Sequence, residues 1–219
     1  MFLAHYGVAM AAKGVSRKES LGSTVMAAQW LDLLWPVLLL LGLESVRIVP
    51  GLTQASALDF VHYPFSHSLL AVAGWAVAIG GIYFVATRRL RGAAVVGGLV
   101  LSHWVLDLLV HRPDLPLWPG SGLRVGLGLW HSAAVTLVLE LGFLALGLAV
   151  YARVTRPRDR IGRWGLWTMI LVLVAFFVSS FAGPPPSESA LGVGGLVLWI
   201  FVPWAFWIDR HRTAEPVGE

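Results

Sequence analysis

Long apolar segments separated by short polar turns make up nearly the whole chain. They lie at about residues 1–15, 21–43, 64–87, 92–111, 129–151, 164–182 and 191–208. Most of them approach the length of about 20 residues that an α-helix needs to cross a bilayer. The pattern therefore predicts an all-α fold, a polytopic membrane helical bundle of about seven helices with six to seven spans. We expect a single transmembrane domain over residues 1–219, with a motif-bearing core at 1–152 and an additional two-helix C-terminal part at 164–208.

The composition supports a membrane protein and excludes several other classes. Hydrophobic residues make up 57% of the chain and charged residues only 13%, whereas soluble proteins have about 25% charged residues. The absence of cysteine excludes disulfides and thiolate metal ligands. The net charge of +4 comes from short loops rather than from one continuous basic face, so we expect no nucleic-acid partner.

The distribution of Lys and Arg predicts the orientation in the membrane. When the loops are placed alternately on two sides, all but three of the 16 Lys and Arg fall on one side, the exceptions being Arg47, Arg112 and Arg124. Because cytoplasmic loops carry the excess of basic residues, that side is cytoplasmic in a bacterial inner membrane and contains the C-terminus. The N-terminus lies outside if the short segment 1–15 spans. A first segment lying at the inner face would leave the remaining topology unchanged.

A column of polar side chains interrupts the fourth apolar segment. His103, Asp107 and His111 are spaced four residues apart and therefore lie on one face of a helix. Ionisable groups at membrane depth are costly unless they face a cavity, a partner or an ion. An imidazole and a carboxylate one turn apart are suited to share a cation.

Most other unusual polar residues fall in the outward half of the predicted bundle. His62 and His67 flank the start of the third helix, His131 lies near the start of the fifth, and His5 joins them if the first segment spans. We take His62, His111 and His131 as further candidate ligands. Each is equally consistent with an ordinary interfacial histidine.

Two carboxylates are expected near the middle of the membrane. Asp32 stands four residues before Pro36, and a proline removes the helical partner of that residue's carbonyl. This pattern is consistent with a simple kink, or with a polar pocket that Asp32 faces together with irregular backbone. Glu140 lies nine residues after His131, on the opposite face of an ideal helix. Glu140 is therefore the stronger candidate, unless His131 precedes the regular helix.

Four short motifs carry a family resemblance: His5, Trp30-Leu31-Asp32, His62-Tyr63-Pro64-Phe65-Ser66-His67-Ser68-Leu69-Leu70 and Ser102-His103-Trp104-Val105-Leu106-Asp107. Over roughly residues 1–150 the chain resembles the bacterial inner-membrane metal-dependent hydrolases described as LexA-binding and inner-membrane-associated. The resemblance implies a metal site made by His5, Asp32, His67, His103 and Asp107. This chain has Tyr63-Pro64-Phe65 where the family has a basic residue soon after the first histidine, so a role for His62 does not follow from it.

Nitrogen and oxygen donors without thiolate suit a divalent metal, Zn most of all, with Mn or Fe as alternatives. A bound divalent ion activates water and polarises a phosphoryl or carbonyl oxygen, which predicts a hydrolase. We expect Asp32 and Glu140 to be catalytic, with Glu140 as general base or as a residue that orients a ligand. A site near headgroup depth would take a lipid-like or small-molecule substrate, such as a phosphoester or ester carried by membrane lipids.

Three alternatives stay open. A proton- or ion-coupled transporter would use the same His, Asp and Glu residues beside broken helices, although no internal repeat is evident. A membrane oxidoreductase would bind iron or haem through the histidines and would absorb visible light. A purely structural role predicts that Asp32→Ala and His103→Ala change no phenotype.

Overall fold

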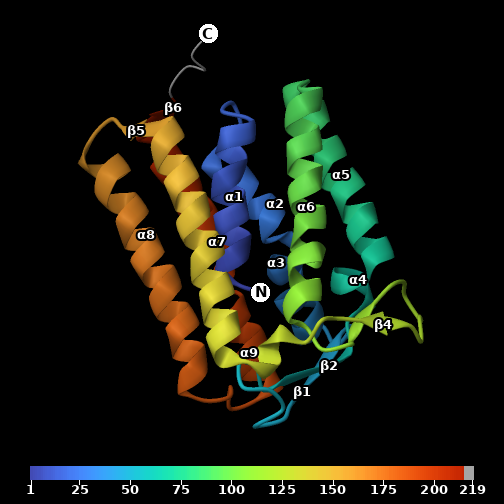
Figure 1. The fold of residues 1–219 in the computed structure, drawn as a ribbon. Helices are drawn as coiled ribbons and strands as arrows, with labels where there is room; N and C mark the ends of the chain where they lie inside the picture. Colours follow the sequence, from blue (N-terminus) through green and yellow to red (C-terminus); the bar gives the residue numbers. More distant parts are fainter. Residues whose placement is uncertain (215–219) are drawn as a thin grey trace.

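The protein is a bundle of helices with short strand pairs in its loops (Figure 1). The computed structural model describes residues 1–214, so the C-terminus, predicted to be cytoplasmic, lies outside the described residues. The helices are α1 (Leu3–Val15), α2 (Leu21–Ala28), α3 (Trp30–Leu40), α4 (Pro64–His67), α5 (Leu69–Thr87), α6 (Leu90–Val110), α7 (Ala133–Val154), α8 (Arg160–Ser179), α9 (Glu188–Gly195) and α10 (Leu198–Arg210), with 3-10 turns η1 (Leu129–His131) and η2 (Ser180–Ala182). The predicted helical bundle is confirmed.

The strands form three antiparallel pairs that the hydrophobic pattern did not predict. They pair β1 (Ser45–Ile48) with β2 (Leu58–His62), β3 (Leu115–Pro116) with β4 (Arg124–Val125), and β5 (Thr155–Pro157) with β6 (Arg212–Ala214). The first pair lies at the end of the bundle opposite to the last (Figure 1). All three strand pairs close loops and leave the bundle helical.

Five helical segments are long and apolar enough to cross a membrane. They are Leu69–Thr87, Leu90–Val110, Ala133–Val154, Arg160–Ala182 and Glu188–Arg210. The pair formed by α2 and α3 adds a sixth span if it is counted as one segment bent by 53°. Hydrophobic side chains such as Val77, Val138 and Leu171 are exposed on these helices, as expected where helices face lipid. The structure therefore supports five or six spans, of which only six lies within the predicted six to seven.

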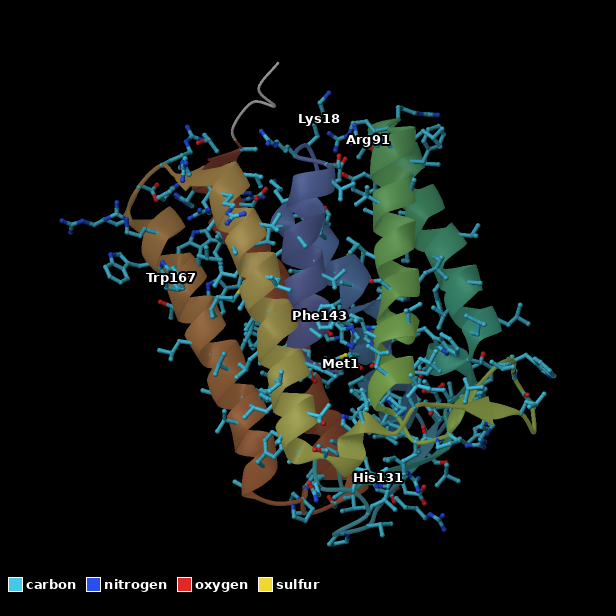
Figure 2. All side chains as sticks on the ribbon, viewed as in Figure 1. Met1, Lys18, Arg91, His131, Phe143 and Trp167 are labelled. Carbon is cyan, nitrogen blue, oxygen red and sulfur yellow. The ribbon has the colours of Figure 1, made fainter. Side chains whose placement is uncertain are left out.

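The first helix is present as predicted but does not cross the bundle. With 13 residues, α1 is about 20 Å long, too short for a hydrocarbon core of about 30 Å. It runs from Met1, in the middle of the bundle, to the end that carries Lys18 and Arg91 (Figures 1 and 2). The N-terminus was expected to lie outside only if the first segment spans the membrane. The short α1 does not meet this condition.

Glycines fix α1 against α7. A Cβ atom added to Gly147 would lie 1.8 Å from the carbonyl oxygen of Gly7, and one added to Gly7 would lie 2.2 Å from the carbonyl oxygen of Phe143. The two backbones are therefore in direct contact, which only a residue without a side chain permits. His5 stands two residues before Gly7, so this contact also sets where its side chain lies.

Breaks interrupt two of the predicted helices. Pro36 stays inside α3, and a bend of 53° falls at Gln29, between α2 and α3. Beside this bend the carbonyl of Ala28 accepts a hydrogen bond from His103. Asp32 and Pro36 both line a cavity, in line with the polar pocket that was one of the two alternatives at this proline. A second break, at Ser68, separates α4 from α5 within the segment predicted as one helix, and its hydroxyl caps α5.

Basic residues gather at one end of the bundle, as the topology count predicts. Lys18 and Arg91 lie at that end and His131 lies at the other (Figure 2). Arg89 ties two of the basic loops together, because its guanidinium lies 3.0 Å from the Glu19 carboxylate and donates to the carbonyl of Lys18.

Candidate functional site

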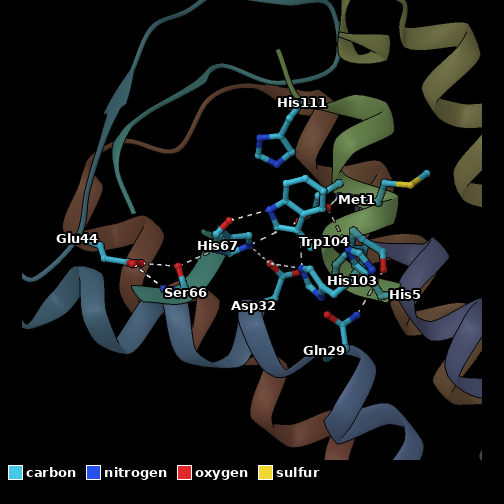
Figure 3. A network of polar contacts seen from close by, with 12 residues as sticks. Met1, His5, Gln29, Asp32, Glu44, Ser66, His67, His103, Trp104 and His111 are labelled. Carbon is cyan, nitrogen blue, oxygen red and sulfur yellow. Dashed lines mark hydrogen bonds and ion pairs between the residues drawn. The ribbon is translucent and has the colours of Figure 1, made fainter. Parts of the chain in front are cut away.

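The five residues nominated as metal ligands meet in the interior of the bundle, and Figure 3 labels all of them except Asp107. They come from four helices: His5 from α1, Asp32 from α3, His67 from α4, and His103 and Asp107 from α6. We call these five the His/Asp cluster. All are buried except Asp32, whose side chain keeps 22% of its surface exposed. The described residues contain two groups spaced to hold an ion, one of His5, His103 and Asp107 and one of Asp32, His67 and His103.

Four donor atoms of the cluster face one another at short range. The Nε2 atom of His103 lies 3.2 Å from Asp107 Oδ2 and 3.6 Å from Asp32 Oδ1. The Nε2 atom of His67 lies 3.6 Å from Asp107 Oδ2 and 3.8 Å from Asp32 Oδ1. Tetrahedral zinc with bonds of about 2.0–2.2 Å places neighbouring donor atoms about 3.4 Å apart. The separations fit the donor set of a divalent ion.

The backbone fixes which nitrogen of His103 carries its proton. Its Nδ1 atom lies 2.7 Å from the carbonyl oxygen of Ala28, and a carbonyl can only accept a hydrogen bond. Nδ1 therefore donates, and in the neutral ring the lone pair is on Nε2. Nε2 is buried without a hydrogen-bond partner among the described residues. A lone pair beside two carboxylates is unfavourable unless the nitrogen is protonated or a cation lies between them.

His67 is oriented in the same way through a serine. Its Nδ1 atom lies 2.7 Å from the hydroxyl oxygen of Ser66, and that hydroxyl donates to Glu44 at 2.6 Å (Figure 3). Its Nε2 atom then points at Asp32 and Asp107. Histidines that bind metals commonly have their second nitrogen held by such an outer partner.

His5 completes the cluster from α1. Its ring stacks on His103 with centroids 3.7 Å apart and planes 7° from parallel. Its Nε2 atom lies 3.3 Å from Asp107 Oδ1, which the amino nitrogen of Met1 also contacts. Neither ring nitrogen of His5 has a hydrogen-bond partner among the described residues. His5 can therefore offer a nitrogen to an ion held together with His103 and Asp107.

Glu140 lies beside the cluster but is held by backbone donors. Its Oε1 accepts from Phe2 N at 2.8 Å and its Oε2 from Ala4 N at 2.9 Å. Glu140 therefore caps the start of α1, where the first N–H groups have no partner within the helix. These two bonds show that Glu140 holds α1 in place, and its catalytic role stays a prediction.

The structure brings one of the three further candidate histidines close to the cluster. His111 ends α6, is buried, and lies 3.0 Å through Nδ1 from Asp114 Oδ1. Burial lowers the pKa of His111 below its ordinary value although Asp114 acts in the opposite direction. His62 and His131 are exposed on β2 and η1 and lie in neither ion-holding group. His131 could line one site with Glu140 only if it precedes the regular helix. It does precede α7, but its side chain lies at the surface.

A cavity of about 560 Å³ gives access to the cluster. The carboxylates and histidines on its wall are Asp32, His67, Asp107, His111 and Glu140. Aromatic and aliphatic residues line the rest, and many belong to the C-terminal part of the chain: Phe176, Phe177, Phe181, Pro184, Leu191 and Leu198. Since Phe181 and Pro184 are exposed, the cavity reaches the surface of the protein. It therefore joins a polar site to an apolar wall.

The sequence patterns missed the residues that orient the ligands. Glu44, the hydroxyl of Ser66 and the carbonyl of Ala28 are all buried at the cluster. Glu44 stands in a polar stretch that looks like an exposed loop, and Ala28 contributes only its backbone. The one available signal was Ser66, which lies directly before His67 in the family motif.

Comparison with known proteins agrees with this architecture. Searches of curated proteins and of solved structures found no match. The family model described as YdjM inner membrane protein matches residues 4–183. The match includes every residue of the His/Asp cluster and continues through α8, beyond the motifs read from the sequence. With five or six candidate spans, the chain is a membrane-embedded protein and belongs to the YdjM inner membrane protein family.

Proposed function

We propose that this chain is a membrane-embedded, metal-dependent hydrolase. The observation that carries the proposal is the buried Nε2 atom of His103, which has no hydrogen-bond partner among the described residues and faces the carboxylates of Asp32 and Asp107. The residues that would hold a divalent metal are His67, His103, Asp32 and Asp107, with His5 against the far oxygen of Asp107. We favour zinc because the donor separations suit tetrahedral coordination; Mn and Fe also accept these donors.

A divalent ion in this site would supply an acidified water and polarise the bond to be hydrolysed. The protein's own contribution is to hold the donors and to manage the proton. Asp32 is the partly exposed carboxylate on the cavity side, so we assign it to accept a proton from the attacking water. We assign Glu140 a positioning role, because its bonds to Phe2 N and Ala4 N keep α1 and His5 in place.

The proposed substrate is a phosphoester or ester carried by a membrane lipid. The cavity combines the cluster with apolar residues of α8, α9 and α10, which suits a molecule with a polar head and a hydrocarbon chain. Its volume lies within the range of about 300–1,000 Å³ that small-molecule sites occupy. The outward-facing position of the site follows from the basic-residue count and is part of the proposal. Binding to LexA, which the family resemblance also implies, stays a prediction.

Elemental analysis tests the metal site. Protein purified in detergent without chelators should contain near-stoichiometric metal per chain, and His103→Ala and Asp107→Ala should both lose it. His131→Ala, which changes an exposed histidine, serves as the matched control and should retain the metal. The same preparations are then assayed on bis(p-nitrophenyl) phosphate and p-nitrophenyl octanoate, with and without chelator. Metal-free wild-type protein, or full hydrolysis in chelator, contradicts the proposal.

A proton- or ion-coupled transporter is the second candidate. The observation that favours it is the pair of helix breaks, at Gln29 and Ser68, beside the cluster, because transporters build their sites from interrupted helices. Metal-free protein that moves protons or sodium in vesicles, and loses this activity in Asp32→Asn, would support the transporter. A visible absorption band in the purified protein would instead indicate an iron or haem oxidoreductase.

A further inference from the structure

A buried chain of hydrogen bonds runs from Glu44 through Ser66 to His67 (Figure 3). Glu44 lies just before β1, and its Oε1 accepts from Phe65 N and Ser66 N, each at 2.8 Å. Its Oε2 accepts from the Ser66 hydroxyl at 2.6 Å, and the oxygen of that hydroxyl lies 2.7 Å from Nδ1 of His67. Glu44 is only 2% exposed and Ser66 is fully buried. None of the assigned ligands other than His67 takes part in this chain.

The direction of these hydrogen bonds follows from the groups at each end. Glu44 meets three donors, as a carboxylate requires. The hydroxyl proton of Ser66 is therefore committed to Glu44, and the oxygen of Ser66 can only accept from His67. This places the ring proton of His67 on Nδ1 and leaves the lone pair of Nε2 towards Asp32 and Asp107.

We infer that Glu44 is a positioning residue for the metal site, acting through Ser66 to fix the tautomer in which His67 can bind a divalent ion. The inference rests on the proposed metal site and adds residues to it that the sequence motifs do not contain. Glu44 also holds the place of His67, because its two bonds to backbone N–H groups fasten the start of α4. A helix of only four residues has little stability of its own and needs such an anchor.

Replacing Glu44 by glutamine should reverse this chain of hydrogen bonds. The two backbone N–H groups require the amide oxygen of the glutamine at the position of Oε1, so its NH₂ group faces Ser66. The oxygen of Ser66 then accepts from the glutamine, and its proton has Nδ1 of His67 as its acceptor. The ring proton of His67 moves to Nε2, where it blocks metal binding. Ser66→Ala removes the relay without forcing either tautomer.

The test measures Zn²⁺ affinity in detergent by competition with a chromogenic chelator. We expect Ser66→Ala to bind Zn²⁺ about 10-fold more weakly and Glu44→Gln about 100-fold more weakly, the range reported for partners behind metal ligands. The double variant should return to about the 10-fold loss of Ser66→Ala, because a reversed relay needs the serine. Ser68→Ala is the matched control: Ser68 is equally buried, and its hydroxyl bonds Pro64 O and caps Ala71 N without touching His67. It should stay within about 3-fold of wild type.

A second readout, the spectrum of bound Co²⁺, separates the outcomes further. The visible spectrum of bound Co²⁺ should change in Ser66→Ala but not in Ser68→Ala, since only the first alters the surroundings of a ligand. Equal losses in these two variants, or a double variant weaker than Glu44→Gln, overturn the inference. If Glu44→Gln does not fold, the comparison of Ser66→Ala with Ser68→Ala decides alone. Wild-type protein that binds no Zn²⁺ refutes the proposed function instead, before any variant is compared.

Discussion

A polar cluster at the end rich in basic residues and the His/Asp cluster around His103 differ in how their charges are met. At the basic end, Lys13 Nζ donates to both oxygens of Asp209, at 3.1 and 3.2 Å, and to the carbonyl of Glu19 at 2.7 Å. The hydroxyl of Tyr151 donates to the same Asp209 at 3.1 Å. Each charge there faces its opposite, an arrangement that serves stability.

The His/Asp cluster is paired less completely. Two carboxylates, Asp32 and Asp107, face imidazole nitrogens at 3.2–3.8 Å. Both ring nitrogens of His5 and the Nε2 atom of His103 are buried without a hydrogen-bond partner among the described residues. Arrangements that break the rules of polar pairing are typical of functional sites. The comparison teaches that the basic-end cluster pairs its own charges, whereas the His/Asp cluster has the donor atoms to hold a further cation.

The largest effect is expected for Asp107→Asn. The substitution keeps the size of the side chain but removes the charge that faces His67 and His103, so Zn²⁺ affinity should fall by more than about 100-fold, beyond the loss expected for an outer partner. Chelator competition measures the affinity. Asp159→Asn, at the exposed start of α8, is the control with unchanged affinity. An Asp107 variant that binds Zn²⁺ like wild type would remove the basis of the comparison.

Lys13→Met should lower the stability of the protein and leave its Zn²⁺ affinity unchanged. It leaves the half-buried carboxylate of Asp209 without its cation, and the unfolding free energy should fall by about 2 kcal/mol, between the costs of breaking surface and fully buried pairs. Zn²⁺ affinity should remain that of wild type. Denaturation of the metal-free protein in detergent, with the same chelator competition, separates the two quantities. A loss of metal with unchanged stability would show that both clusters belong to one site.

Asp32→Asn should have a smaller effect, which differs in sign between the metal-free and the metal-bound protein. In metal-free protein the substitution relieves repulsion between two carboxylates that share one set of imidazoles, so the unfolding free energy should rise by about 1 kcal/mol. With metal added, the variant should become less stable than wild type because it binds the ion more weakly. Thermal unfolding with and without Zn²⁺ gives both numbers. Destabilisation in the metal-free state would mean that Asp32 is an ordinary paired carboxylate.

The smallest effect concerns an ion pair at the surface. Partial burial of Asp59 raises its pKa, but hydrogen bonds from Arg47 and Arg112 outweigh burial and hold the pKa below its ordinary value. A lowered pKa stabilises the folded state above the unfolded value of about 3.9 and loses this contribution as the pH falls through the folded value. Asp59→Asn should therefore lower the free energy of unfolding by about 0.5 kcal/mol at pH 7 and should leave it unchanged at a pH below the folded pKa of Asp59. Unfolding curves against pH check this, and a constant difference contradicts it.

The sequence could predict the donors but not the parts that orient them. The spacing of His103 and Asp107 places both on one helix face, and Asp32 and His67 stand out because charged or polar groups are costly in apolar segments. Glu44 was invisible to that reasoning, since a glutamate in a polar stretch carries no sign of burial. Glu140 was expected to be catalytic because it lies deep in the membrane. In the structure its carboxylate also accepts hydrogen bonds from backbone N–H groups at the start of α1.

In the fold, too, local features could be predicted and contacts between distant segments could not. The lengths of the apolar segments predicted the long helices and most of their ends, because these depend on the composition of each segment alone. The bend at Gln29 could not be predicted, because it depends on a contact between the carbonyl of Ala28 and a histidine from α6. The shortness of α1 was visible, but its burial in the centre of the bundle depends on Gly147 of α7, a pairing across distant parts of the chain.

The contact between Gly7 and Gly147 also determines when the site can form during synthesis. Because α1 is too short to be inserted as a span and its backbone packs directly on α7, it cannot complete this packing until the ribosome has made α7, long after α1. His5 therefore joins the cluster late, and the apolar wall from α8, α9 and α10 follows later still. The order of translation keeps the His/Asp cluster incomplete until most of the bundle is in the membrane.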